Sequence, residues 1–340
     1  MSRSGERGEP ADTGATLLAT ERWFVQHGLP YFVPEEREAA RRALHSRRTL
    51  VMLVLTVLVA LGGGVALAAL LGQVALAPAV LMLLAGLAVL GYGATTLRAR
   101  PIASFAVRRT LGSLRLLLPL ATRALPLLML FITFLFINAE VWQLAASMGG
   151  ATLWLTVMLF GLFAVLFLFV RLPEELDSVD AQMDATRLAE ACRRTPLEGL
   201  AGDSIESEAA RDRATVSGFE RANLILVLVI AQAVQVFLLA LCVFTFFMMF
   251  GALVMDDGVQ LAWTQREALR NAPVLTHLSL ELFQVSIFLA AFSGLYFTVC
   301  AVTDEAYRDQ FFTQVKEELD RSVGVRAVYL ALRQHSETSA

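Results

Sequence analysis

Charged residues are scarce in this 340-residue sequence, and long stretches lack them altogether. Only 17% of the residues are charged, whereas 56% are hydrophobic. Residues 49–97 contain no charged side chain, and neither do residues 222–255. Because one membrane-spanning helix needs about 20 predominantly apolar residues, uncharged runs of this length predict a membrane protein.

Cysteine and the common catalytic motifs are also scarce. The three cysteines form no C-x-x-C pair and no cluster with the four histidines, which argues against a disulfide framework and a zinc site. The sequence has no P-loop, so ATP hydrolysis by this chain is excluded, and no H-E-x-x-H or G-x-S-x-G motif indicates a hydrolase. We therefore expect no cofactor, and enzyme activity is not favoured.

The basic residues are distributed unevenly along the chain, and Lys316 is the single lysine. If the N-terminus is cytoplasmic, all 28 basic residues except Arg266 and Arg270, that is 26, fall on the cytoplasmic side. This asymmetry predicts orientation, with both termini inside. No early apolar segment indicates a signal peptide, so the first span is expected to be retained. The arginine-rich loops follow from topology, and no nucleic-acid partner is expected.

The apolar runs predict an all-α fold, a polytopic bundle of six transmembrane helices with cytoplasmic amphipathic helices. In chain order we expect a disordered N-terminus (1–20), a cytoplasmic aromatic segment and helix (21–48), a hairpin of spans one and two (49–97), a basic interfacial segment (98–123), a hairpin of spans three and four (124–170), a cytoplasmic helical loop (171–221), spans five and six with an outer loop at 256–277 (222–302), and cytoplasmic C-terminal helices (303–340). Span three is expected to be one helix, and new helices are expected at Pro173 and after Gly324.

Two inner segments are expected to contact the membrane surface. The first carries aromatic side chains that suit the membrane–water boundary, namely Trp23, Phe24, Tyr31 and Phe32. The second is a short amphipathic helix whose arginines are expected to bind anionic lipid headgroups, namely Arg108, Arg109 and Arg115. The alternative for the second segment is an ordinary basic loop that only sets topology.

Polar side chains inside the predicted spans are the candidates for function, because hydrocarbon makes them costly. We expect them to line a polar path open to the outside, with Glu140 and Glu281 as proton or cation sites. The candidate residues are Asn138, Glu140, Gln143, Gln232, Gln235, Glu281 and Gln284. The alternative is that they form interhelical hydrogen bonds or reach the outer interface, and so hold the bundle together without a further function.

Asp177, Asp180 and Asp184 share one face of a predicted helix. Membrane prenyl- and phosphatidyl-transferases hold magnesium and a diphosphate with Asp-rich motifs. This sequence lacks their D-G-x-x-A-R run and a second Asp-rich loop. A solvated acidic face is therefore the favoured interpretation.

Four short segments carry a resemblance to known sequences, namely ERWF at 21–24, GLPYF at 28–32, TRALP at 122–126 and FINAEVWQ at 136–143. They resemble uncharacterised multi-pass integral membrane proteins of actinobacteria. The resemblance implies a bacterial cytoplasmic membrane, and so does the preference for Arg over Lys, which is typical of GC-rich genomes. It implies no activity and assigns no residue roles.

Three functional hypotheses follow from the sequence. The preferred one is a transporter, channel or permease-like subunit. The second is a membrane scaffold that binds a cytoplasmic protein partner through its inner surface, because the outer connections are short. The third is a membrane-embedded lipid-modifying enzyme, which rests only on the Asp face. Cys192 is expected in the cytoplasm, where an impermeant thiol reagent would reach it only after the membrane is opened.

Overall fold

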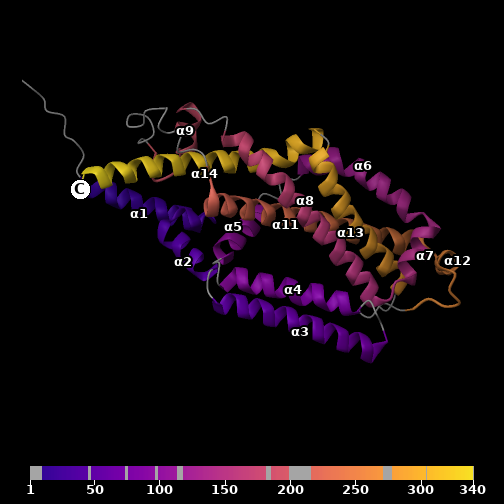
Figure 1. Cartoon of the computed structure of the whole chain (residues 1–340). Coiled ribbons are helices and arrows are strands. Elements are labelled where there is room, and N and C mark those ends of the chain that lie inside the picture. Colours follow the sequence, from indigo (N-terminus) through magenta and orange to yellow (C-terminus); the bar gives the residue numbers. More distant parts are fainter. Residues whose placement is uncertain are drawn as a thin grey trace, which may run out of the picture.

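The computed structural model describes residues 10–44, 47–72, 76–95, 99–112, 118–180, 185–198, 216–270, 278–303 and 305–339, and its fold is all-α (Figure 1). The first half contains α1 (Pro10–Gln26), the 3-10 helix η1 (Pro30–Phe32), α2 (Pro34–Leu44), α3 (Arg47–Leu71), α4 (Leu76–Thr95), α5 (Ala99–Gly112), α6 (Leu118–Phe136) and α7 (Ala139–Ser147). The second half contains α8 (Gly150–Asp180), α9 (Ala185–Ala191), α11 (Gly218–Val254), α12 (Asp257–Thr264), α13 (Leu280–Thr303) and α14 (Glu305–Ser339).

The apolar helices are compatible with a membrane protein. Among the described residues, three helical stretches are long and apolar enough to cross a bilayer: Gly150–Pro173, Gly218–Val254 and Leu280–Cys300. A bent pair, Leu128–Phe136 and Ala139–Ser147, could supply a fourth span with a 74° bend. Shorter apolar stretches lie in α3 and α4, at Val54–Leu67 and Ala77–Gly93.

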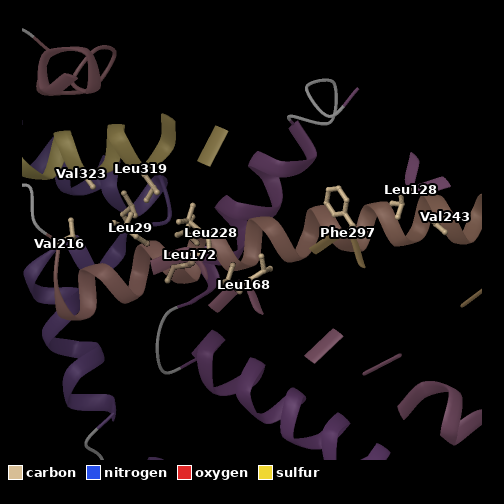
Figure 2. Close-up of a cluster of buried hydrophobic side chains, with 14 of the residues drawn as sticks. Leu29, Leu128, Leu168, Leu172, Val216, Leu228, Val243, Phe297, Leu319 and Val323 are labelled. Carbon is tan, nitrogen blue, oxygen red and sulfur yellow. The ribbon is translucent and has the colours of Figure 1, made fainter. Parts of the chain in front are cut away.

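The centre of the bundle is the packing of α8, α11 and α13 against one another. Two glycines let α11 and α13 approach closely: Gly251 of α11 lies against Leu282, and Gly294 of α13 lies against Val236. At 1.5 Å per residue, α11 is about 55 Å long, whereas the hydrocarbon core is about 30 Å thick. α11 is therefore longer than one crossing of the hydrocarbon requires. Figure 2 shows buried side chains of α8, α11 and α14 meeting around it.

Helices α3 and α4 form a hairpin along one side of the bundle (Figure 1). A side-chain carbon added at Gly64 of α3 would lie 2.8 Å from the backbone oxygen of Ala77 in α4. The hairpin contacts the remaining helices through α4, which packs on α8 and α5. Most described apolar side chains of α3 are exposed, as expected for a helix that faces lipid.

The bundle has two differently built ends. At one end, which we call the terminal cap, η1 and α5 pack on α11, α2 packs on η1, and α1 and α9 pack on α14. At the other end, which we call the distal cap, α7 and α12 pack on each other and on the start of α13 (Figure 1). In the terminal cap, α14 and α9 approach each other closely. A side-chain carbon added at Gly324 of α14 would lie 2.5 Å from Cβ of Ala191 at the end of α9.

Several predicted helix boundaries were wrong. The third span is not one helix, because it breaks at residue 137 and Asn138 caps the new helix α7 by accepting a hydrogen bond from the backbone N–H of Glu140. Pro173 lies inside α8, and Gly324 lies inside α14. Residues 10–20, expected to be disordered, form part of α1. The start of α2 at Pro34 agrees with the sequence.

The aromatic segment near the N-terminus packs inside the protein, contrary to the predicted position at the membrane–water boundary. Phe24 makes an edge-to-face contact with Tyr329 of α14, with ring centroids 5.5 Å apart. Tyr31 makes a similar contact with Phe219 of α11. Its backbone N–H also donates to Asn223 Oδ1 at 3.0 Å. These contacts join segments about 200 to 300 residues apart, which no local sequence pattern reveals.

The basic segment forms the helix α5, which packs on α11 through a buried face that includes Ile102 and Ala106, and its position at a membrane interface stays a prediction. Arg108 and Arg109 are exposed, and Arg109 Nη2 lies 2.9 Å from Glu318 Oε2. Arg115 lies outside the described residues. Binding of lipid headgroups by these arginines stays a prediction.

Candidate functional site

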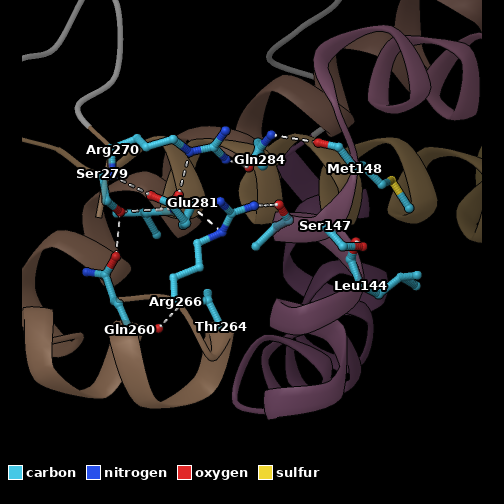
Figure 3. Close-up of polar contacts among 12 residues, drawn as sticks. Leu144, Ser147, Met148, Gln260, Thr264, Arg266, Arg270, Ser279, Glu281 and Gln284 are labelled. Atoms are coloured by element: carbon cyan, nitrogen blue, oxygen red, sulfur yellow. Dashed lines mark hydrogen bonds and ion pairs between the residues drawn. The ribbon is translucent and has the colours of Figure 1, made fainter. Parts of the chain in front are cut away.

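A connected polar cluster lies in the distal cap and is built around Glu281, in the first turn of α13 (Figure 3). Glu281 is fully buried. Arg270 donates to it twice, from Nε to Oε1 at 2.9 Å and from its backbone N–H to Oε2 at 3.2 Å. Nε of Arg266 lies 3.6 Å from the same Oε1. The carboxylate is therefore already paired with two guanidinium groups.

The cluster also joins α13 to the turn between α7 and α8. Gln284 accepts a hydrogen bond from Arg270 Nη2 at 3.3 Å and donates from Nε2 to the carbonyl of Met148 at 2.9 Å. Arg266 donates to the carbonyl of Ala146 at the end of α7. Figure 3 shows these groups converging from the two sides of the distal cap. The arrangement joins the loop that carries Arg266 and Arg270 to α13 and to the end of α7.

A second polar pair supports the same region from α12. Gln260 is buried and donates from Nε2 to the carbonyl of Met255 at 2.9 Å. Its Oε1 accepts from the hydroxyl of Ser279, and that hydroxyl also accepts from the backbone N–H of Leu282 at 3.1 Å. Ser279 therefore caps the start of α13.

The structure brings together only some of the predicted path residues. Glu281 and Gln284 share Arg270, as described above. Glu140 is exposed at the start of α7, and Gln143 and Gln235 are half-buried on α7 and α11. Gln232 of α11 is buried, and its Oε1 has no hydrogen-bond partner among the described residues. A continuous polar path through the bilayer stays a prediction.

Four residues of the distal cluster, Gln260, Arg266, Arg270 and Ser279, were not predicted as site residues. A signal for two of them is present in the sequence, because Arg266 and Arg270 are the two basic residues that the predicted topology leaves outside. Charges that depart from the orientation pattern need a local partner, and Glu281 is close along the chain. Gln260 and Ser279 carry no comparable signal.

A different feature of the spans is an apolar groove of about 480 Å³ between α8, α11 and α13. Its walls include Phe160, Gly161 and Ala164 of α8, Ala233, Phe237 and Ala240 of α11, and Ala291, Gly294 and Thr298 of α13. The hydroxyl of Thr298 donates to the carbonyl of Gly294 at 2.8 Å, so this polar group is already satisfied within its helix. The groove has the chemistry of an apolar ligand site and lacks the oxygen ligands that a cation needs.

Metal and thiol chemistry gain no support from the described part of the chain. It holds no group of three or more His, Cys, Asp or Glu side chains placed to bind a metal ion. The side chains of Asp177 and Asp180, and all of Asp184, lie outside the described residues. Cys192 is buried in the terminal cap, and burial raises the pKa of its thiol to about 11.

No protein-family model, curated protein or solved structure matches this chain significantly. The resemblance to actinobacterial membrane proteins stays a prediction.

Proposed function

We propose that this chain is a six-span protein of a bacterial cytoplasmic membrane that binds an apolar chain, such as a lipid acyl chain, between α8, α11 and α13. In this proposal it acts as a permease-like or lipid-handling subunit, with both termini in the cytoplasm. The observation that carries the proposal is the apolar groove within the spans. The proposed ligand is therefore hydrophobic, whereas the polar path predicted from the sequence would carry protons or cations.

The proposed topology rests on charge and helix length. Helices α3 and α4 have 25 and 20 residues, so each is long enough to supply one of the two spans that complete the six. The orientation follows from the 26 basic residues on one side. Arg266 and Arg270, the two exceptions, both lie against the Glu281 carboxylate, which offsets one of their two positive charges.

The groove suits an acyl chain in size and in wall chemistry. Its volume lies in the range of about 300 to 1,000 Å³ that is usual for ligand sites. Lipid tails are as apolar as leucine, so burial from water cannot favour the bound chain over the bilayer. Binding must come from dispersion contacts with close-fitting walls. The small residues Gly161, Ala233 and Ala291 leave space for such contacts.

Filling the groove tests the proposal. A side-chain carbon at Gly161 would meet no atom within 4 Å, so Gly161→Phe should place a ring in the groove without displacing a helix. Gly62 of α3 has equally open surroundings and does not line the groove, which makes Gly62→Phe a matched control. Native mass spectrometry of protein extracted in mild detergent should show lipid adducts in the parent chain and in the control.

Loss of most of the adduct in Gly161→Phe alone would support the proposal. Equal adduct in all three proteins, or equal loss in both variants, would contradict it. Circular dichroism and size-exclusion profiles of the three proteins establish whether they are equally folded.

The alternative function is a scaffold that binds a cytoplasmic partner through the terminal cap. It is favoured by a surface groove of about 330 Å³ lined by α1 and α2, where the side chain of Leu18 is 56% exposed. Deleting residues 304–340 would not test this idea cleanly, because the buried residues Val323 and Tyr329 of α14 belong to the core. Leu18→Glu is a better test, since it should abolish partner binding without altering lipid adducts.

A further inference from the structure

A cavity of about 410 Å³ lies in the terminal cap, between α2, the start of α11 and α14. Its walls are unlike those of the apolar groove, because most of them are charged or polar. They are formed by Arg37, Glu38 and Arg41 of α2, by residues 217–220 at the start of α11, and by Arg326 and Leu330 of α14. Three guanidinium groups from two helices thus face one space.

Glu220 accounts for part of this charge and holds two of the arginines in place. It is 5% exposed, and Arg326 binds its Oε2 from Nε at 2.8 Å and from Nη2 at 2.6 Å. Arg37 donates from Nη1 to the other carboxylate oxygen. A guanidinium group has five N–H donors, so Arg37 can bind a second oxygen-bearing group while it keeps this bond.

Arg41 is positioned by an aromatic ring. Its guanidinium carbon lies 5.5 Å from the centroid of the Phe219 ring, within the range of a cation–π contact. With Arg37 and Arg326, it brings three guanidinium groups to the cavity wall. Each guanidinium group carries five N–H donors, so an anion can bind in addition to its protein contacts. The first backbone N–H groups of α11 add partial positive charge at the same place. An anion is therefore favoured there.

We infer that this cavity binds a phosphate group, carried by either an anionic lipid headgroup or a soluble phosphorylated molecule. Forked guanidinium donors match the several oxygens of a phosphate better than a single point charge does. The cavity lies at the start of α11, which the proposed topology places at the cytoplasmic side of the bilayer, a depth that either source can reach. This inference does not depend on occupancy of the apolar groove.

Arg41→Gln is the informative variant. Removing Arg37 or Arg326 would leave the buried Glu220 short of a partner and would disturb folding. Arg41 is exposed. Both oxygens of Glu220 are bound by Arg37 and Arg326, so Arg41→Gln leaves the buried carboxylate paired. Arg42→Gln is the matched control, because Arg42 is the next residue of α2, is exposed and does not line the cavity.

Binding is measured by thermal unfolding of the full chain in neutral detergent, titrated with inorganic phosphate, with short-chain phosphatidylglycerol and with short-chain diacylglycerol. We expect stabilisation by one or both phosphates beyond that by diacylglycerol. Arg41→Gln should weaken this binding about tenfold, as expected for loss of one charge-assisted hydrogen bond, and Arg42→Gln should not.

The titrations also separate the two sources. Binding of phosphatidylglycerol alone would identify a lipid headgroup, whereas binding of inorganic phosphate would identify a site open to soluble ligands. Stabilisation by diacylglycerol equal to that by both phosphates would overturn the inference, as would equal weakening in the two variants. Lipid binding that is lost in Gly161→Phe and unchanged in Arg41→Gln would support the apolar groove and reject the phosphate site.

Discussion

Arg270 holds Glu281 with both its side chain and its backbone, at 2.9 Å from Nε to Oε1 and at 3.2 Å from the backbone N–H to Oε2. The carboxylate is fully buried, whereas the Arg270 side chain is 46% exposed. The pair therefore joins the surface of the distal cap to the interior of the bundle. We propose that Glu281 has a structural role, in which it holds the loop that carries Arg270 against α13.

Glu281→Gln should destabilise the protein by about 1.5 to 3 kcal/mol, the range for hydrogen bonds to charged groups. The amide keeps the shape but loses the charge that Arg266 and Arg270 face. The free energy of unfolding in mixed detergent is the measurement. Glu267→Gln is the control, because Glu267 is exposed on the same loop. Equal stability of the two variants would contradict the structural role.

Gly251→Ala should also destabilise the protein, because the added carbon would lie 2.3 Å from Leu282 Cδ1 and 3.1 Å from Phe136 Cζ. Overpacking of this kind costs about 1 to 3 kcal/mol. Gly161→Ala is the matched control, since a carbon there meets nothing within 4 Å. Comparison of the two melting temperatures checks the prediction, and an unchanged value for Gly251→Ala would show that α11 and α13 are not in close contact.

Tyr329 should stay protonated well above pH 10. Burial, with a 2.7 Å hydrogen bond from its hydroxyl to Glu21, raises its pKa to about 12 from the ordinary 10. The folded state thus holds this proton more tightly than the unfolded state. Its contribution to stability is complete below pH 10 and is lost as the pH rises towards 12. Tyr329→Phe should remove that part of the pH dependence, which unfolding curves between pH 9 and pH 11 would reveal. Parallel curves for the two proteins would contradict it.

Cys192 should resist thiol reagents even in opened membranes, because it is buried and its thiol has a pKa of about 11. It therefore cannot report topology in the way its sequence position suggests. Arg193→Cys places a thiol at the exposed neighbouring position. In the proposed topology, an impermeant maleimide labels this variant only after the membrane is opened. Labelling in intact spheroplasts would contradict the inside location, and fast labelling of the parent Cys192 would contradict its burial.

The spans could be predicted from the sequence where uncharged runs are long. α8, α11 and α13 lie where the hydropathy places them, because a bilayer selects for apolar length. The break before α7 could not be predicted in this way. The break lies at Asn138, and no Pro or Gly at this point of the apolar run signals it. The bend is supported by Trp142, whose Nε1 donates to the carbonyl of Phe136 at 2.7 Å.

The roles of single residues could be predicted less well from the sequence, because each role depends on the groups that the side chain contacts. Asn138 was expected to line a path, and the structure uses it as a helix cap. Glu281 was expected to be a proton or cation site, and it lies between two arginines that approach from the adjacent loop. A polar residue type predicts that burial of the side chain is costly. Only the structure shows which groups bind that side chain and offset the cost.

Photochemical cross-linking in reconstituted vesicles tests the central claim most directly. A phospholipid with a photoreactive group along its acyl chain is activated, and the modified peptides are mapped by mass spectrometry. The account predicts adducts concentrated on groove residues of α8, α11 and α13, such as Gly161, Phe237 and Ala291, and their loss in Gly161→Phe. Adducts spread evenly over the exposed faces of α3 and α4, and unchanged in that variant, would contradict it.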